Sequence, residues 1–308
     1  MIKQLAPMAF VLLAVACSDI AAPAPADGGA PVPLDPTAGM VPIEVPAFEL
    51  APGAEAVMCS YVPPSGLERW ASGAYVNVPG SHHMAVRRIR DARGVVASGP
   101  VDCANGDVLA PFGGEGNDFA SVGDLFSAGV PELAVTLPDG VAVRVAADEG
   151  LLFEVHAVNA ATEPRTVHVG YWLATIDAGE VIEEAGSVLA FNQGMTVPPG
   201  LSTQTAACEA PSTFRIFTVQ SHMHSRGRGF SLHADAREVV SGDASPYYLL
   251  PNGGASVAAG EALAWSCDFD NDTGEPLTVG PSVAGNEMCG FVALVYPFTG
   301  AHFCHGAP

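Results

Sequence analysis

Residues 214–224 form the stretch FRIFTVQSHMH, in which an apolar run rich in strand-forming residues ends in two histidines. Side chains at positions i and i+2 of an extended strand point to the same face. We therefore expect His222 and His224 to lie next to each other and to form a clamp of two imidazoles for one metal ion. A third ligand has to come from another part of the chain.

Similar short apolar segments recur along the chain, at residues 142–145, 151–156, 166–172 and 291–296. Glycine, proline, asparagine and aspartate separate them at intervals of roughly ten residues, a spacing that is typical of an antiparallel sandwich or barrel. Helix signals are scarce. The sequence therefore predicts an all-β fold.

A faint internal repeat suggests that the fold is built from two related halves. Residues 159–167 and 271–279 share the pattern Asn-x-x-x-Glu-Pro-x-Thr-Val, and residues 48–59 are similar to residues 195–208. Chance similarity of glycine- and proline-containing loops would explain either match alone, but both occur in the same order. We expect two antiparallel β-sandwich domains, at 41–177 and 178–308.

The first forty residues have the composition of an export signal and a tether. Residues 1–16 combine Lys3 with an apolar run that is too short to span a bilayer, as in a secretory signal peptide. The segment ends in small residues before Cys17, which resembles a bacterial lipobox and predicts a lipidated cysteine; an ordinary signal peptide with a spare cysteine is the alternative. Residues 17–40, rich in alanine, proline and glycine, are expected to form a disordered tether. The prediction is an exported bacterial lipoprotein on the outer membrane, the cell surface or the periplasmic side, held to the membrane only by its lipid anchor.

Charge and cysteine content narrow the possible partners and the redox environment. The formal net charge of −21 argues against nucleic acid and against an anionic membrane surface as partners. Besides Cys17, the chain has six cysteines and no Cys-x-x-Cys pair, which in an exported protein indicates three disulfides rather than a zinc ribbon. The sequence by itself leaves their pairing open.

The first half of the chain offers three histidines, His82, His83 and His156. Neighbouring residues of a regular strand point to opposite faces, so His82 and His83 can bind one ion only if the backbone bends there. The preceding Pro79-Gly80 makes such an irregularity plausible, and His156 ends the apolar segment 151–156. The alternative is that His82 or His83 is an ordinary surface or core histidine.

In the second half, Met288 is the candidate for the third ligand beside His222 and His224. A methionine is more often a core residue, but Met288 begins the apolar segment 288–296 and precedes Cys289, which would fix its backbone. A thioether beside two imidazoles is a soft ligand set that suits copper(I) better than zinc.

Four stretches, 81–84, 153–156, 220–224 and 287–289, together resemble the copper type II, ascorbate-dependent monooxygenases, which include peptidylglycine α-hydroxylating monooxygenase and dopamine β-hydroxylase. The resemblance covers about residues 46–304. It implies two jelly-roll sandwiches, each with a copper site that faces a solvent-filled cleft between the domains. It also implies the pairings Cys59–Cys103, Cys208–Cys304 and Cys267–Cys289.

The resemblance assigns a role to each ligand set. His82, His83 and His156 would hold an electron-donating copper, and His222, His224 and Met288 would hold the copper at which dioxygen and substrate react. The catalytic residues would then be His222, His224 and Met288. Two unlike coppers suit the reaction, because inserting one oxygen atom into a C–H bond consumes two electrons and copper transfers one at a time.

The sequence departs from the family at the positions that recognise substrate. Peptide-amidating members have an arginine two residues before the His-x-His pair and a tyrosine four residues after the methionine, where this chain has Gln220 and Val292. Glu154 replaces a neutral amide that is common two residues before the third histidine. A peptidylglycine substrate is therefore doubtful. Gln220 and Glu154 are the candidate substrate residues, and Glu154 suits a cationic substrate unless it is a carboxylate at the cleft edge with no role.

The sequence as a whole favours a copper-dependent monooxygenase that hydroxylates a C–H bond of a small molecule or peptide. It would use two copper ions, dioxygen and a one-electron reductant such as ascorbate. One alternative is a non-catalytic copper-binding surface lipoprotein for storage, delivery or sensing, although a carrier would need only one site. Another is a jelly roll that binds carbohydrate or a partner, with incidental metal sites.

Overall fold

A computed structural model describes residues 36–308 apart from 91–93, 95–96, 105–122, 245–246, 281, 301 and 307–308. Residues 36–308 form one compact unit. The predicted signal peptide, Cys17 and most of the predicted tether lie outside the described residues. Where the structure is described, no helix has the length and apolar character needed to cross a membrane.

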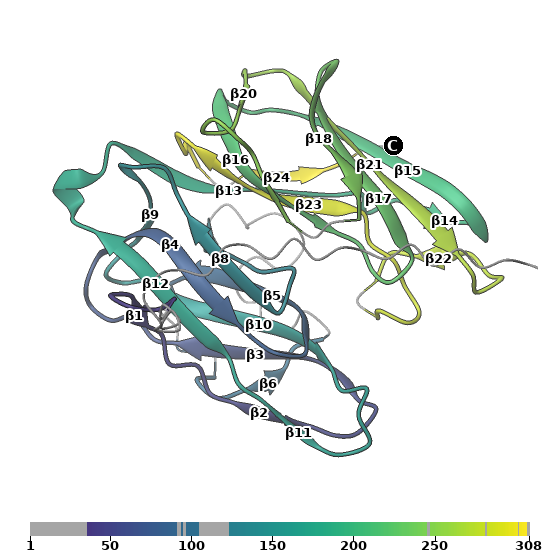
Figure 1. Cartoon of the computed structure of the whole chain (residues 1–308), viewed down its shortest axis with the longest axis horizontal. Helices are drawn as coiled ribbons and strands as arrows, with labels where there is room; N and C mark the ends of the chain where they lie inside the picture. The colour runs from purple at the N-terminus through teal and green to yellow at the C-terminus, as the bar shows by residue number, and fades with distance from the viewer. Residues whose placement is uncertain are drawn as a thin grey trace, which may run out of the picture. The chain divides into compact units, whose positions relative to one another are not determined.

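One long sheet runs through both halves of the chain (Figure 1). Eight of its strands follow each other in the order β1-β12-β4-β9-β13-β23-β16-β19, while β8, β20 and β24 pair with β4, β16 and β13. In chain order its strands are β1 (Val41–Pro42), β4 (Arg69–Asn77), β8 (Glu132–Thr136), β9 (Val141–Val145), β12 (Gly170–Ile176), β13 (Glu183–Phe191), β16 (Phe214–His222), β19 (Tyr248–Leu249), β20 (Ala255–Val257), β23 (Gly290–Tyr296) and β24 (His302–His305).

Four smaller sheets complete the β structure. A five-stranded sheet has the order β6-β3-β10-β5-β7 and a four-stranded sheet the order β15-β21-β17-β18, while β11 pairs with β2 and β22 with β14. The bounds are β2 (Phe48–Leu50), β3 (Glu55–Val62), β5 (Ser81–Ile89), β6 (Val101–Asp102), β7 (Gly123–Asp124), β10 (Gly150–Val158), β11 (Arg165–Val167), β14 (Thr196–Val197), β15 (Gly200–Glu209), β17 (Gly227–Ala234), β18 (Arg237–Asp243), β21 (Ala262–Asn271) and β22 (Leu277–Thr278).

The helical content of the described residues is one short 3-10 helix, η3 (Ala178–Glu180). The predicted all-β, antiparallel sandwich class is therefore confirmed. It follows from the alternation of buried and exposed side chains along the strands, as in β8 and β21, which lets each strand bury one face in a core.

Two hydrophobic cores lie between the long sheet and the smaller sheets. The first core packs side chains of β4, β9 and β12 against those of β5 and β10, and the second packs β13, β16 and β23 against β17 and β21. Phe217, Leu294 and Tyr296 belong to β16 and β23 of the second half but pack into the first core. β9 and β13 continue the sheet from one half to the other as a parallel pair. The division into two domains between residues 177 and 178 stays a prediction. Each half has a core, and the long sheet is common to both halves.

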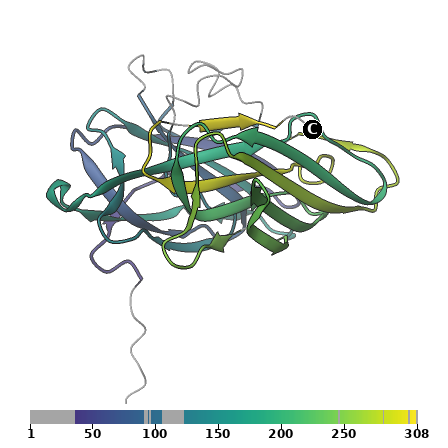
Figure 2. The same ribbon diagram turned by 90° about the horizontal axis from the view of Figure 1, so that it is seen from above.

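The internal repeat corresponds to the same local structure in both halves. Asn159 directly follows β10 and Asn271 is the last residue of β21, and each is only 2% exposed. The Asn159 amide donates to the carbonyl groups of Leu50, Ala51 and Glu163, and the Asn271 amide donates to those of Val197 and Glu275. In both halves the loop after this asparagine leads into an edge strand, β11 or β22, which pairs with the strand near the start of that half. Figure 2 shows the same strands turned by 90°.

The three disulfides join the cysteines that the resemblance implied. Cys59–Cys103, Cys208–Cys304 and Cys267–Cys289 have Cα–Cα distances of 5.8, 6.1 and 5.8 Å, within the usual range for bridged cysteines. The third bridge joins Cys289, which lies between Met288 and the first residue of β23, to Cys267 in the middle of β21.

Candidate metal centre

A β-bulge turns the neighbouring His82 and His83 toward the same region. β5 and β10 are antiparallel, and His156 pairs with His83, while the next residue, Ala157, pairs with Ser81. His82 is thus the extra residue of the bulge, which breaks the alternation that would send the two rings to opposite faces. Gly80, with a φ of +81°, precedes the strand. The irregular backbone that the sequence required is therefore present.

The first predicted ligand set comes together in space. His82, His83 and His156 each offer a ligand atom, and these atoms all lie within 4.8 Å of one another. His156 is 1% exposed, while His82 and His83 are half-buried. Three imidazoles at this spacing can bind one metal ion.

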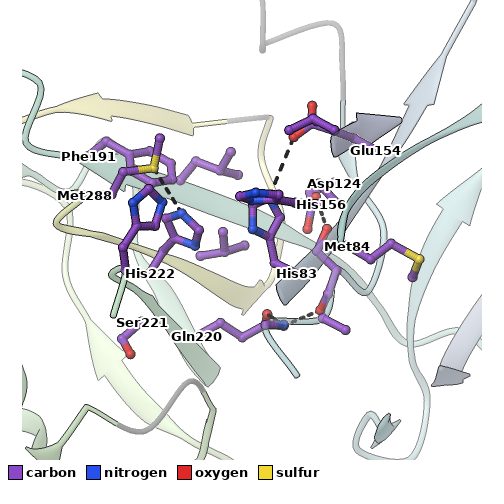
Figure 3. A pocket seen from close by; sticks show the side chains of 18 of the residues that line it. His83, Met84, Asp124, Glu154, His156, Phe191, Gln220, Ser221, His222 and Met288 are labelled. Atoms are coloured by element: carbon purple, nitrogen blue, oxygen red, sulfur yellow. Dashed lines mark hydrogen bonds and ion pairs between the residues drawn. The ribbon is translucent and has the colours of Figure 1, made fainter. Parts of the chain in front are cut away.

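The second predicted ligand set also comes together, at the ends of two adjacent strands. His222 ends β16 and pairs with Gly290, the first residue of β23, which places Met288 beside it. The distance from His222 Nε2 to Met288 Sδ is 3.0 Å, and the rings of His222 and His224 lie 5.7 Å apart. Met288 is therefore a cavity residue in contact with an imidazole (Figure 3).

The two sets are in contact with each other. The ring centroids of His83 and His222 lie 4.9 Å apart, and those of His82 and His224 lie 5.6 Å apart. Within the first set the rings are 5.0 to 5.4 Å apart. The resemblance implied sites on two domains that face a solvent-filled cleft, whereas the structure has the five rings in one cluster, which we call the five-histidine cluster (His82, His83, His156, His222 and His224).

Burial favours the neutral, metal-binding form of four rings of this cluster, those of His82, His156, His222 and His224. It lowers the pKa of His82 to about 3, with His83 as the next cause, and it also lowers the pKa values of His156, His222 and His224. The neighbouring rings add to the effect, because two imidazolium groups side by side repel each other. A neutral imidazole has a lone pair on one ring nitrogen and is the common form of a histidine ligand.

Two ring nitrogens of the cluster are free of hydrogen bonds to the described residues and could each bind a metal ion. His82 Nε2 and His83 Nδ1 are buried and have no hydrogen-bond partner in the described structure. A buried polar atom without a partner costs about 1–3 kcal/mol. A metal ion bound by these nitrogens would remove that cost, so the side chains present fit the copper ions that the sequence predicted.

Glu55 supports the first set through His156, and no sequence pattern predicts this role. Its Oε1 atom lies 2.8 Å from His156 Nε2, which leaves Nδ1 as the ring nitrogen available to a metal. The same oxygen accepts the N–H of Val283, 3.0 Å away, in the other half of the chain. Burial alone would raise the pKa of Glu55, but the Val283 N–H and His156 outweigh it and lower that pKa. A carboxylate in this place orients a histidine ligand.

Glu287 supports the second set, and it too was missed from the sequence. Its side chain is fully buried, and its oxygens accept the N–H groups of His224 and Arg226 at 2.9 and 3.0 Å. The chain after the clamp is thereby fixed against the residue next to Met288. Residues 287–289 are one of the stretches that carry the resemblance, but the resemblance assigns no role to Glu287, so only the fold reveals it.

Both predicted substrate residues line the cavity but are held by protein groups. Glu154 makes an ion pair with Arg87 through Oε2, at 2.8 Å. Its other oxygen, Oε1, lies 3.9 Å from His83 Nε2. Burial would raise the pKa of Glu154, but Arg87 and His83 lower it well below its usual range. The amide oxygen of Gln220 accepts the N–H of Gly129 at 3.1 Å, and its NH₂ group donates to the Ser127 carbonyl.

A cavity of about 380 Å³ adjoins the cluster and is lined by residues of both ligand sets. Its volume is in the lower part of the range for small-molecule sites. Leu189, Phe191 and Val292 form an apolar part of its wall close to His222. In Figure 3, the rings of His83 and His156 lie between Glu154 on one side and His222 with Met288 on the other.

No protein-family model and no curated protein matches this sequence. Among solved structures, the major capsid protein P2 of bacteriophage PM2 is 12% identical over 85% of this chain and 98% of its own, with a TM-score of 0.37. The structure of Sulfolobus turreted icosahedral virus is 11% identical over 84% of this chain and 61% of its own, with a TM-score of 0.23. Similarities this distant carry no argument about what this chain does.

Proposed function

We propose that this protein is a copper-dependent monooxygenase that hydroxylates a C–H bond of a small molecule. The overall reaction combines R–H, dioxygen, two electrons and two protons to give R–OH and water, with ascorbate or a similar one-electron donor as reductant. The proposal is supported above all by the convergence of the six residues that the sequence marked as ligands. Two of their buried ring nitrogens have no hydrogen-bond partner among the residues that the structure describes.

The residues would have three roles: binding copper, supporting the ligands, and positioning the substrate. His82, His83 and His156 would hold one copper, and His222, His224 and Met288 would hold the second, where the thioether favours copper(I). When bound, copper would supply the one-electron redox steps and the activation of dioxygen. Glu55 and Glu287 fix the orientation of His156 and the backbone of His224. The apolar wall of Leu189, Phe191 and Val292 would exclude water and position the substrate beside the second ligand set.

The location that we propose is outside the cytoplasm, on a bacterial envelope. Three disulfides suit an oxidising compartment. Lipidation at Cys17 and anchoring by that lipid remain part of the proposal.

Copper loading of the full chain tests the proposal. We expect two copper ions per chain and, with ascorbate, oxygen uptake that rises when a substrate is added. Met288→Ile should lower the affinity for one of the two ions by at least about tenfold and abolish the substrate-dependent uptake. The matched control is Met195→Ile, a core substitution away from the cluster, which should retain both coppers and the uptake.

The alternative of a copper-binding lipoprotein makes a different prediction. A carrier would hold copper tightly, exchange it with an apo acceptor, and show no oxygen uptake beyond that of free copper. Fewer than two coppers per chain in the wild-type protein would contradict the two-copper enzyme.

A further inference from the structure

We propose that the five-histidine cluster is one shared metal centre, so that ions bound by the two ligand sets sense each other directly. This inference rests on the proposed copper function but goes beyond it, because two sites across a solvent-filled cleft would perform the same reaction. The distances between ring centroids of different sets are 4.9, 5.6 and 6.1 Å, close to those within the sets, which run from 5.0 to 5.7 Å. No layer of solvent fits between rings at this spacing.

His82 occupies the middle of the cluster. Its ring lies 5.4 Å from His83, 5.3 Å from His156, 6.1 Å from His222 and 5.6 Å from His224. It is also the bulge residue of β5, and its Nε2 atom is buried without a hydrogen-bond partner in the described part of the chain. His82 is therefore placed to serve as a ligand to an ion on either side.

Two side chains tie the walls of the centre together across the chain. Gln220, in β16, binds the backbone of Ser127 and Gly129 in the first half. Glu55, in β3, joins the His156 ring to the Val283 N–H in the second half. These ties lie next to opposite ligand sets; Gln220 is buried, whereas Glu55 is an exposed residue whose bond reaches the buried His156 ring. They hold the two sets at contact distance.

Negative charge around the cluster makes two cations at close range acceptable. Glu55 contacts His156, Glu154 lies near His83, and Glu287 binds the His224 backbone. Arg87 offsets the charge of Glu154, which leaves Glu55 and Glu287 to balance the charge of bound metal ions. At low dielectric, such charges interact strongly with ions in the same site.

Electron paramagnetic resonance of the Cu(II)-loaded full chain is the test. Two unpaired electrons held at contact distance interact, so we expect a broadened signal and a half-field transition at two coppers per chain. His222→Ala should leave a single copper whose spectrum differs from either component of the wild type. His168→Ala, an exposed histidine outside the cluster, should leave the coupled spectrum intact.

The outcomes separate this inference from the proposed function. Two coppers with additive, independent signals, and no spectral change at the first set in His222→Ala, would overturn the shared centre and leave the monooxygenase proposal standing. A single copper per chain whose signal is altered by both His83→Ala and His222→Ala would support a shared centre and overturn the two-copper enzyme. A single copper altered by only one of these variants, or no copper binding, would overturn both.

Discussion

At the scale of single residues, the centre depends on carboxylates that hold an imidazole or backbone N–H groups in place. Glu287 is the clearest case, because both of its oxygens accept N–H groups of the segment that follows the His-x-His clamp. A buried carboxylate with two such bonds is satisfied only in this backbone conformation. It therefore couples the position of His224 to that of the adjacent Met288.

Replacing Glu287 by glutamine tests this coupling. The amide keeps one acceptor oxygen but turns an NH₂ group toward a backbone N–H, so one buried donor is left without a partner. We expect the free energy of unfolding to fall by about 1–3 kcal/mol, together with weaker copper binding at the second set. Denaturant unfolding and a copper competition titration measure the two effects. The control is Glu275→Gln, an exposed site; equal behaviour of the two variants would contradict the role of Glu287.

The sequence predicted ligands at this scale but not the groups that support them. The His-x-His spacing, the adjacent histidines and the Met-Cys pair are local patterns, and the structure brings those side chains together. Glu55 and Glu287 act through hydrogen bonds to a ring or to backbone N–H groups far away along the chain, which leave no local pattern. For the same reason, the sequence placed Glu154 and Gln220 at the cavity without predicting that Arg87 and Ser127 bind them.

At the scale of strands and loops, the repeated asparagine explains why the two halves share a sequence pattern. Asn159 and Asn271 are buried, and each amide group organises the loop that follows a long strand. The side-chain oxygen of each residue also accepts a backbone N–H two positions further on, as in an Asx turn. The repeat can be recognised in the sequence because all the residues of this loop are close together in the chain. The bulge at His82 has no such pattern and follows only from the requirement that both His82 and His83 bind one ion.

Alanine at these two positions should therefore have similar effects. Asn159→Ala and Asn271→Ala each leave buried carbonyl groups without a donor, and we expect losses of about 1–3 kcal/mol in the free energy of unfolding. Thr162→Ala, in the exposed part of the first loop, is the control and should stay within about 0.5 kcal/mol of the wild type. Thermal or denaturant unfolding of the three variants gives the comparison. If Asn271→Ala left the free energy of unfolding unchanged, the repeated asparagine would not stabilise the loop in the second half.

At the scale of the whole described chain, the joining of the two halves decides the geometry of the centre. Each half has a core that its own strand pattern predicts, but the contacts that bring the ligand sets together connect residues far apart in sequence. Gln220 and Gly129 are 91 positions apart, and Glu55 and Val283 are 228 positions apart. Strand periodicity carries no information about such pairs. The sequence could therefore predict two ligand sets and could not predict that they form one cluster.

The tie made by Gln220 gives the last prediction, at this scale. Gln220→Ala removes the acceptor of the Gly129 N–H and the donor to the Ser127 carbonyl, so the segment around residues 123–129 should exchange its backbone hydrogens faster. We expect stability to fall by about 1–3 kcal/mol while each half keeps its core. Gln193→Ala, an exposed residue that lines the same cavity, is the matched control and should leave exchange unchanged. Hydrogen exchange followed by mass spectrometry distinguishes a local release at 123–129 from a general loss of stability. If the backbone N–H groups of 123–129 kept their protection from exchange, the packing of Phe217, Leu294 and Tyr296 alone would hold the halves together.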